Sequence, residues 1–270
     1  MSRRVLTIAL TCAALASAAP ANAVVGGSDA APGEFPSVAE ITFGIYSCTG
    51  TLIDSTHVLS AGHCGSATGL AFGSPVGFPG PLIDVRIGSH GAGDGERVPV
   101  SSVAVSPAYL GLSDRNDLSI LTLSRPSVKA PTKVAGAGER SIWNPGVLAT
   151  IAGWGNTSSD GQEFPEILQK AQVPITTDAY CESAYSDAEG WDFDPATMLC
   201  AGYPEGGIDT CQGDSGGPLF ATAADGARRV VGVTSWGNGC AEEGFPGVYA
   251  RVAETALREW VRSVAPNGVN

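Results

Sequence analysis

Short apolar runs, separated by residues that favour turns, limit most narrowly what this chain can fold into. Glycine and proline, at 36 and 18 of the 270 residues, suit many turns better than long helices. We predict strands at residues 38–43, 51–53, 58–61, 82–87, 97–105, 118–123, 147–151, 168–173, 229–234 and 247–251. Strands at this density predict an all-β protein, built as a barrel or a sandwich.

One helix and several connecting segments interrupt this pattern. Residues 254–264 carry apolar side chains at spacings of three and four, which predicts a C-terminal helix with one apolar face. Residues 65–81 and 185–195 are expected to be surface loops. Residues 124–146 have the composition of a linker and mark the expected domain boundary.

The first 23 residues have the features of a secretory signal peptide. Arg3 and Arg4 form a positive start, residues 5–19 form an apolar run too short for a comfortable membrane span, and residues 21–23 read Ala-Asn-Ala. No later apolar run is long enough to cross a bilayer, so we expect a secreted, extracellular protein that does not engage a membrane. The net charge of −12 disfavours nucleic acid as a partner, because binding phosphates requires clustered Lys and Arg.

Six cysteines remain once Cys12 is removed with the signal peptide. They are Cys48, Cys64, Cys181, Cys200, Cys211 and Cys240. An even number in an exported chain predicts disulfides, although spacing alone leaves their pairing open. A metal site is the weaker interpretation, because the sequence has no Cys-x-x-Cys pair and only three histidines.

The stretch DTCQGDSGGP, residues 209–218, places a serine among glycines. Ser215 follows Gly213 and Asp214 and precedes Gly216 and Gly217. Glycine tolerates positive φ, so this run can form a tight turn whose N–H groups point one way and could hold a negative oxygen. A serine hydroxyl is a weak nucleophile and needs a base elsewhere in the chain. The alternative is an ordinary surface turn.

The candidates for that base are His57, His63 and His90. Histidine suits this role because its pKa lies near about 6.5. His63 stands in LSAGHC, at the end of an apolar strand and next to Cys64, whereas we expect His57 to be an ordinary partly buried side chain and His90 to lie in a solvated loop. Asp117, at the start of the apolar run DLSIL, could orient the imidazole, although by itself it also fits a structural turn.

The order His63, Asp117, Ser215 in LSAGHC, DLSIL and GDSGGP resembles the chymotrypsin-like serine proteases, most closely the trypsin branch and its secreted bacterial members. The resemblance extends from VVGG at Val24 to the terminal helix. It implies two six-stranded antiparallel β-barrels, residues 24–137 and 138–270, with a C-terminal helix and an active site between the barrels.

The resemblance also implies a role for each site residue. Ser215 would attack the scissile carbonyl, His63 would take its proton, and Asp117 would hold His63 in place. The N–H groups of Gly213 and Ser215 would form the oxyanion hole. The implied disulfides are Cys48–Cys64, Cys181–Cys200 and Cys211–Cys240.

Asp209, six residues before Ser215, matches the floor of the primary pocket in the trypsin branch. A buried carboxylate there favours a substrate Arg or Lys. The other expected substrate-binding residues are Thr210, Gln212, Ser235, Trp236, Gly237 and Gly247. The expected activity is a serine endopeptidase cutting after Arg or Lys, with a neutral-to-alkaline optimum. The alternatives are a non-catalytic binding protein on the same fold and a hydrolase of different preference.

Activation is implied by the match of VVGG to the family's mature N-terminus, whose ammonium pairs with the acid before the nucleophile. Here these residues are Val24 and Asp214. No Arg or Lys stands directly before Val24. Signal peptidase therefore either cuts after Ala23 or cuts near Ala18 and leaves a short propeptide.

Few further partners are expected. Protein and peptide substrates, and proteinaceous protease inhibitors, fit the family, and we expect a monomer without cofactor or metal. Asp94 and Glu96 lie where some relatives bind calcium, but two acids do not supply six oxygens. Gly62 replaces an alanine that is usual in relatives, and we expect this change to be harmless.

Overall fold

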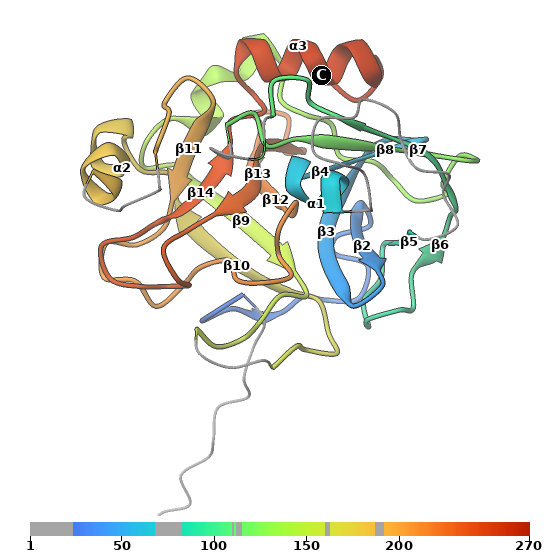
Figure 1. Ribbon diagram of the computed structural model, residues 1–270, viewed down its shortest axis with the longest axis horizontal. Helices are drawn as coiled ribbons and strands as arrows, with labels where there is room; N and C mark the ends of the chain where they lie inside the picture. The colour runs from blue at the N-terminus through green and yellow to red at the C-terminus, as the bar shows by residue number, and fades with distance from the viewer. Residues whose placement is uncertain (1–23, 68–82, 110, 112–114, 160–162, 187–191) are drawn as a thin grey trace, which may run out of the picture.

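The computed structural model describes residues 24–67, 83–109, 111, 115–159, 163–186 and 192–270. Within these residues two antiparallel sheets of seven strands lie side by side (Figure 1). The first sheet has the order β6-β5-β2-β3-β4-β8-β7 and the second the order β1-β10-β9-β12-β13-β14-β11. The predicted signal peptide, residues 1–23, lies outside the described residues.

The first sheet comprises β2 (Val38–Phe43), β3 (Tyr46–Asp54), β4 (His57–Ser60), β5 (Asp84–Ile87), β6 (Glu96–Arg97), β7 (Val100–Val105) and β8 (Ser119–Leu123). The second comprises β1 (Ser28–Asp29), β9 (Leu148–Gly153), β10 (Gln169–Pro174), β11 (Met198–Ala201), β12 (Pro218–Thr222), β13 (Arg228–Trp236) and β14 (Gly247–Ala250). Each sheet has six strands of four or more residues and one two-residue strand, β6 or β1, at its edge. The predicted all-β class with two antiparallel sheets is therefore confirmed.

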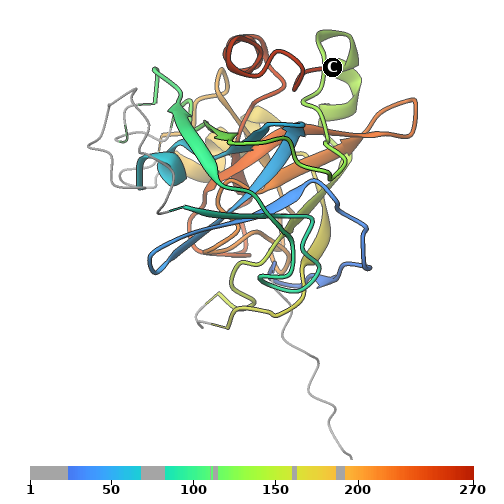
Figure 2. The ribbon, with the colours of Figure 1, turned by 90° about the vertical axis from the view of Figure 1, so that its right-hand side faces the viewer.

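The helices are short except for the last one. They are α1 (Gly62–Ala67), the 3-10 helix η2 (Ala137–Trp143), α2 (Asp178–Tyr185) and α3 (Thr255–Val264). The predicted C-terminal helix is confirmed as α3, whose Leu257 and Val261 are buried in a core cluster with residues of both sheets. Figure 2 shows α3 and the C-terminus at the same end of the molecule. No described helix is long and apolar enough to span a membrane.

The N-terminal segment belongs to the second sheet, and the chain then crosses to the first sheet at β2. Strand β1 pairs with β10, so that Ser28 lies opposite Lys170. The division of the chain into residues 24–137 and 138–270 stays a prediction. The segment 124–146, which its composition marked as a linker, contains η2 and buries Trp143. It is therefore packed structure for part of its length.

Among the elements that the sequence did not predict are β11, β12 and α2. Strand β12 starts with Pro218 directly after the glycine-rich turn, and β11 has only four residues. Helix α2 buries only Cys181 and Tyr185, which is too few for an apolar stripe, although Thr177 accepts a capping bond from the Tyr180 N–H. In the two predicted loops, 65–67 belong to α1 and 185 ends α2, while 68–82 and 187–191 lie outside the described residues.

Candidate active site

The glycine-rich turn of the second sheet packs directly on strand β3 of the first. The Thr49 N–H donates to the Ser215 carbonyl (2.8 Å), and the Thr49 hydroxyl donates to the Gly213 carbonyl (3.0 Å). Gly216 has a φ of 82°, and a Cβ at this position would collide with the Ser60 hydroxyl and the Thr49 carbonyl. The close approach of the two sheets therefore requires glycine here.

A buried carboxylate holds the histidine that follows β4. His63 lies at the start of α1, and Asp117 stands two residues before β8 and is fully buried. Asp117 Oδ2 lies 2.8 Å from His63 Nδ1, and its Oδ1 accepts the His63 backbone N–H, also at 2.8 Å. A neutral imidazole that donates Nδ1–H to this carboxylate keeps Nε2 as its proton acceptor.

Ser235 of β13 completes the bonding of this carboxylate. Its hydroxyl donates to Asp117 Oδ2 at 2.5 Å, so the acid from the first sheet is held by a side chain from the second. Donors on both oxygens stabilise a carboxylate that is otherwise costly to bury. The sequence predicts Ser235 in the substrate pocket but does not predict this bond, because the two residues are 118 positions apart.

The residue after His63 contacts the carbonyl of Ser215. Cys64 Sγ lies 3.6 Å from the Ser215 oxygen, and Cys64 is joined to Cys48 of β3 by a disulfide. The segment that contains His63, after β4 of the first sheet, therefore lies next to the segment that contains Ser215, before β12 of the second sheet.

A pocket of about 170 Å³ connects Ser215 with Asp209. Five of the other residues predicted to bind substrate line it, namely Thr210, Gln212, Ser235, Trp236 and Gly237. Thr234 and Gly239 also line it and were not predicted. Gly247 lies behind the acid, where a Cβ would collide with Asp209 Oδ1. The predicted set is therefore brought together around one cavity.

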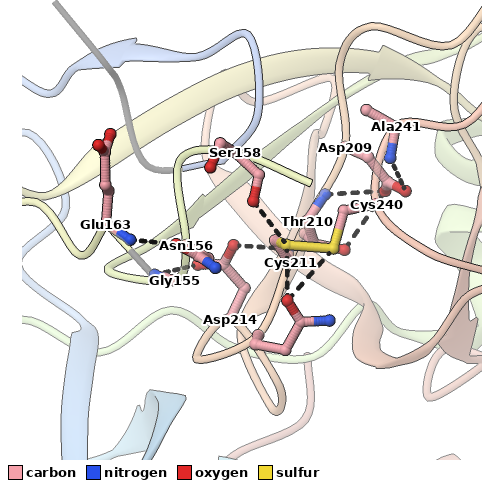
Figure 3. The surroundings of a disulfide bond; sticks show 11 residues. Gly155, Asn156, Ser158, Glu163, Asp209, Thr210, Cys211, Asp214, Cys240 and Ala241 are labelled. Carbon is pink, nitrogen blue, oxygen red and sulfur yellow. Dashed lines mark hydrogen bonds between the residues drawn. A yellow bond between two sulfur atoms is a disulfide. The ribbon is translucent and has the colours of Figure 1, made fainter. Parts of the chain in front are cut away.

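Asp209 is a buried acid with few donors (Figure 3). Its Oδ1 accepts the Thr210 N–H (2.8 Å) and its Oδ2 accepts the Ala241 N–H (3.2 Å). Burial raises the pKa of Asp209 to about 7, and the neighbouring Asp214 charge adds to this, although the two N–H bonds act in the opposite direction. A cation in the pocket would favour the ionised carboxylate.

Asp214, in the glycine-rich turn, is fully buried, and its side chain lies against residue 155 (Figure 3). Its carboxylate accepts the Gly155 N–H (2.8 Å) and the Cys211 N–H (2.9 Å). Burial raises the pKa of Asp214 to about 7, against the lowering effect of these two bonds. A second buried acid therefore lies directly before Ser215 in the chain.

Val24, the expected mature N-terminus and partner of Asp214, is also buried. Val24 has no exposed surface and a φ of 58°. The Asp209 N–H donates to the Val25 carbonyl (3.2 Å), and the two residues form an isolated antiparallel bridge, so this segment runs beside the pocket residue Asp209. In the continuous chain the Val24 nitrogen is a peptide nitrogen, so the ion pair with Asp214 requires cleavage.

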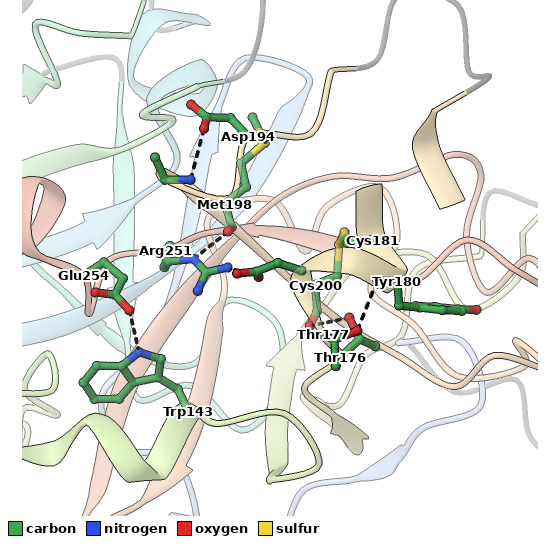
Figure 4. Close-up of polar contacts among 12 residues, drawn as sticks. Trp143, Thr176, Thr177, Tyr180, Cys181, Asp194, Met198, Cys200, Arg251 and Glu254 are labelled. Atoms are coloured by element: carbon green, nitrogen blue, oxygen red, sulfur yellow. Dashed lines mark hydrogen bonds and ion pairs between the residues drawn. A yellow bond between two sulfur atoms is a disulfide. The ribbon is translucent and has the colours of Figure 1, made fainter. Parts of the chain in front are cut away.

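Three disulfides surround the site. They join Cys48 to Cys64, Cys181 to Cys200 and Cys211 to Cys240, which is the pairing that the resemblance implies. Figure 3 shows the third beside Asp209, and Figure 4 places the second between α2 and β11. In Figure 4, Arg251 also holds β11 through the Met198 carbonyl (2.6 Å).

The remaining histidines have partners away from this site. His57 is partly buried, as expected, and its Nδ1 lies 2.8 Å from Asp54 Oδ1. His90 is also partly buried, contrary to the expectation of a solvated side chain, because its Nε2 approaches the Ala30 carbonyl (3.1 Å).

The two acids considered for calcium are bonded to protein donors. Asp94 accepts the backbone N–H groups of His90 and Gly91, and Glu96 binds Arg125, Ser127 and the Val128 N–H. Within the described residues, the one group at metal-ligand spacing is Cys48, His63 and Cys64, and its sulfurs are joined to each other.

Comparisons with known proteins match almost the whole described chain. The family model described as Trypsin matches residues 24–261. A trypsin from Saccharopolyspora erythraea is 42% identical over 233 residues, covering 85% of this chain and 93% of its own. Trypsin-1 from Astacus astacus is 35% identical over 252 residues (90% and 100%), and a trypsin from Xenopus laevis 33% over 252 residues (89% and 90%).

Proposed function

Because the chain belongs to the trypsin family of chymotrypsin-like serine peptidases, we propose that it is a secreted endopeptidase that cleaves proteins and peptides after Arg or Lys. The observation that supports this specificity is that Ser215 and the buried Asp209 line the same pocket. Family membership supports the reaction, and the pocket supports the choice of substrate.

In the proposed mechanism Ser215 Oγ attacks the scissile carbonyl while His63 Nε2 takes its proton. Asp117 holds the imidazole in the tautomer whose Nε2 carries no proton and can accept one, and it stabilises the imidazolium that forms. His63 then gives the proton to the leaving amine, and water hydrolyses the acyl-enzyme by the same steps in reverse order. The bond between Asp117 and His63 Nδ1 supports these roles.

The N–H groups of Gly213 and Ser215 are proposed to stabilise the oxyanion. Gly213 has a φ of 98°, which a glycine adopts at little cost and which turns the chain at this point. The bonds from Thr49 to the carbonyls of Gly213 and Ser215 fix the turn before substrate arrives. Donors fixed in advance lose little energy to reorganisation during the reaction, which is why such a site accelerates acyl transfer.

Specificity follows from the cost of burying Asp209. In the empty pocket the raised pKa of about 7 reflects that cost. A guanidinium or ammonium group from the substrate would offset it by pairing with the carboxylate in a site that excludes water. Gly237, which lines the pocket, leaves room for the long side chain that carries the charge, and Gly247 leaves room for the Asp209 carboxylate.

Activation is proposed to free the α-ammonium group of Val24, which would pair with Asp214. A positive charge beside this buried carboxylate would lower the pKa of Asp214 from about 7 and keep it ionised. Since no Arg or Lys precedes Val24, no trypsin-like activator is required. N-terminal sequencing tests this step, and active protein that begins upstream of Val24 would contradict it.

We further propose that the enzyme is a monomer that needs no cofactor or metal and is open to proteinaceous inhibitors. The experiment that tests the function compares hydrolysis of matched peptides ending in Arg, Lys, Phe or Ala by protein that begins at Val24. Rapid cleavage after Arg and Lys is expected, with loss of this preference in Asp209→Ser. Preferred cleavage after Phe, or Arg preference retained by Asp209→Ser, would refute the pocket assignment.

A further inference from the structure

A group of three charged residues outside the pocket joins the segment before β8 to the segment before β11. Arg115 lies two residues before Asp117, on the first-sheet side. Its guanidinium Nη2 bonds to Asp192, and its Nε lies 3.8 Å from Asp194 Oδ2. Both acids precede β11 of the second sheet. We call Arg115, Asp192 and Asp194 the bridging triad.

The acidic side of the bridging triad is anchored. Asp194 Oδ1 accepts the Ala196 N–H (3.0 Å) and Oδ2 accepts the Thr197 hydroxyl (3.2 Å), so this carboxylate starts the turn into β11. Figure 4 shows Asp194 beside Met198, the first residue of that strand. A shift of Arg115 would therefore be opposed by a fixed part of the second sheet.

The residue between the two acids connects the bridging triad to the pocket wall. Phe193 is 8% exposed and belongs to a cluster with Tyr185, Met198 and Cys200, against which Trp236 packs. The Tyr185 ring meets the Trp236 ring edge-on at 4.7 Å. Since Trp236 lines the pocket, the bridging triad lies one packing layer behind the wall that receives substrate.

We propose that Arg115 is a positioning residue, whose pairing with Asp192 and Asp194 holds the Asp117 segment against the Trp236 wall and tightens the binding of extended substrates. The inference rests on the proposed function for its kinetic readout. The Ser235–Asp117 bond links the Asp117 segment to β13 inside the protein, and the bridging triad links the same segment to the residues before β11 at the surface. Arg115 does not touch the reacting atoms in this scheme, so it acts on KM and not on the chemical step.

The expected size of the effect is modest because the pairs are partly exposed. The side chains of Arg115 and Asp192 are 42% and 70% exposed, and exposed ion pairs contribute little each. We expect KM for a peptide with four residues on the acyl side of the cleaved bond to rise about three- to fivefold in Arg115→Ala. Salt near 1 M screens charges beyond about 3 Å, so the difference between variant and wild type should shrink there.

The experiment measures kcat and KM for that long peptide and for a single-residue arginine amide. Expected results are a higher KM for the long peptide alone, an unchanged kcat, partial recovery in Arg115→Lys, and recovery in the charge swap Arg115→Asp with Asp192→Arg. The matched control is Arg262→Ala, which removes an exposed ion pair to Glu259 on α3 at 3.0 Å. A fall in kcat, an equal effect on both substrates, or the same effect in Arg262→Ala would overturn the proposal.

Hydrogen exchange separates this proposal from the proposed function. The amides of residues 115–118 and 192–198 are expected to exchange faster in Arg115→Ala than in wild type, and Arg262→Ala should leave them unchanged. If wild-type protein cleaves no Arg or Lys peptide, the proposed function fails. The hydrogen-exchange comparison then tests by itself whether Arg115 positions these segments. Equal exchange in wild type and Arg115→Ala would overturn it.

Discussion

Replacing Asp209 with asparagine tests the electrostatics of the pocket, because the change keeps the side-chain shape and removes the charge. Burial raises the pKa of Asp209 to about 7. A cationic ligand binds the ionised carboxylate, so its affinity must fall as the pH drops through and below this value. One proton with this pKa predicts affinity for a cation that is roughly 100-fold weaker at pH 5 than at pH 8.

The assay is calorimetric titration of benzamidine into protein that begins at Val24 and carries Ser215→Ala. This substitution prevents self-digestion. The affinity is expected to fall with pH as calculated. In the double variant that also carries Asp209→Asn, affinity at pH 8 should be lower by about two to four orders of magnitude, since a buried pair that loses one partner costs roughly 3–5 kcal/mol.

The double variant also serves as a control for titratable groups other than Asp209, such as His63. Any pH dependence caused by His63 would persist in the double variant, whereas dependence caused by Asp209 would vanish. A flat affinity between pH 8 and pH 5 in protein with Asp209 intact would refute the reasoning, as would equal affinity in the two proteins.

Three further predictions follow from neighbouring contacts. Ser235→Ala removes the hydroxyl bond to Asp117 and is expected to lower the unfolding free energy by roughly 1.5–3 kcal/mol in a denaturant titration; unchanged stability would count against that bond. Gly62→Ala places a Cβ 3.0 Å from Asp117 Oδ1 and from Tyr109 Cδ1, so we expect about 1 kcal/mol lower stability and a several-fold lower kcat/KM. An equal or higher kcat/KM would show that these neighbours move aside without cost to the site. Because folding raises the pKa of Asp209, this group favours the folded state at low pH and loses that effect as the pH rises from about 4 through 7. Asp209→Asn should therefore be more stable than wild type at pH 8, by at most about 4 kcal/mol, with the difference vanishing toward pH 4 in thermal unfolding; a lower Tm than wild type at pH 8 would contradict this.

The sequence was informative where the chemistry is local. The apolar runs predicted most strands, and residues 38–43 coincide with β2 because apolar and polar side chains alternate there. The glycines around Ser215 predicted a tight turn, and the structure gives Gly213 and Gly216 positive φ values. In each case neighbouring residues determine the backbone, so a single stretch of sequence contains the signal.

The contacts that join the two sheets could not be predicted in this way. Thr49 bonds to a carbonyl 164 residues away, and Ser235 bonds to Asp117 across 118 residues. Arg115 meets Asp192 across 77 residues. Thr49, Arg115 and Asp192 stand in no pattern that differs from an ordinary strand or loop, and the motifs that contain Asp117 and Ser235 do not indicate that the two side chains meet. Only the folded chain shows these contacts.

The measurement that tests the central claim most directly is covalent labelling with 4-nitrophenyl 4-guanidinobenzoate. Its guanidinium enters a pocket for Arg, and attack by a serine Oγ on the ester carbonyl expels nitrophenol and leaves a stable acyl group on the protein. Peptide mass mapping of protein that begins at Val24 should place one acyl group on Ser215, with labelling slowed by benzamidine and absent in Ser215→Ala. An unlabelled Ser215, or an acyl group on another residue, would contradict the account.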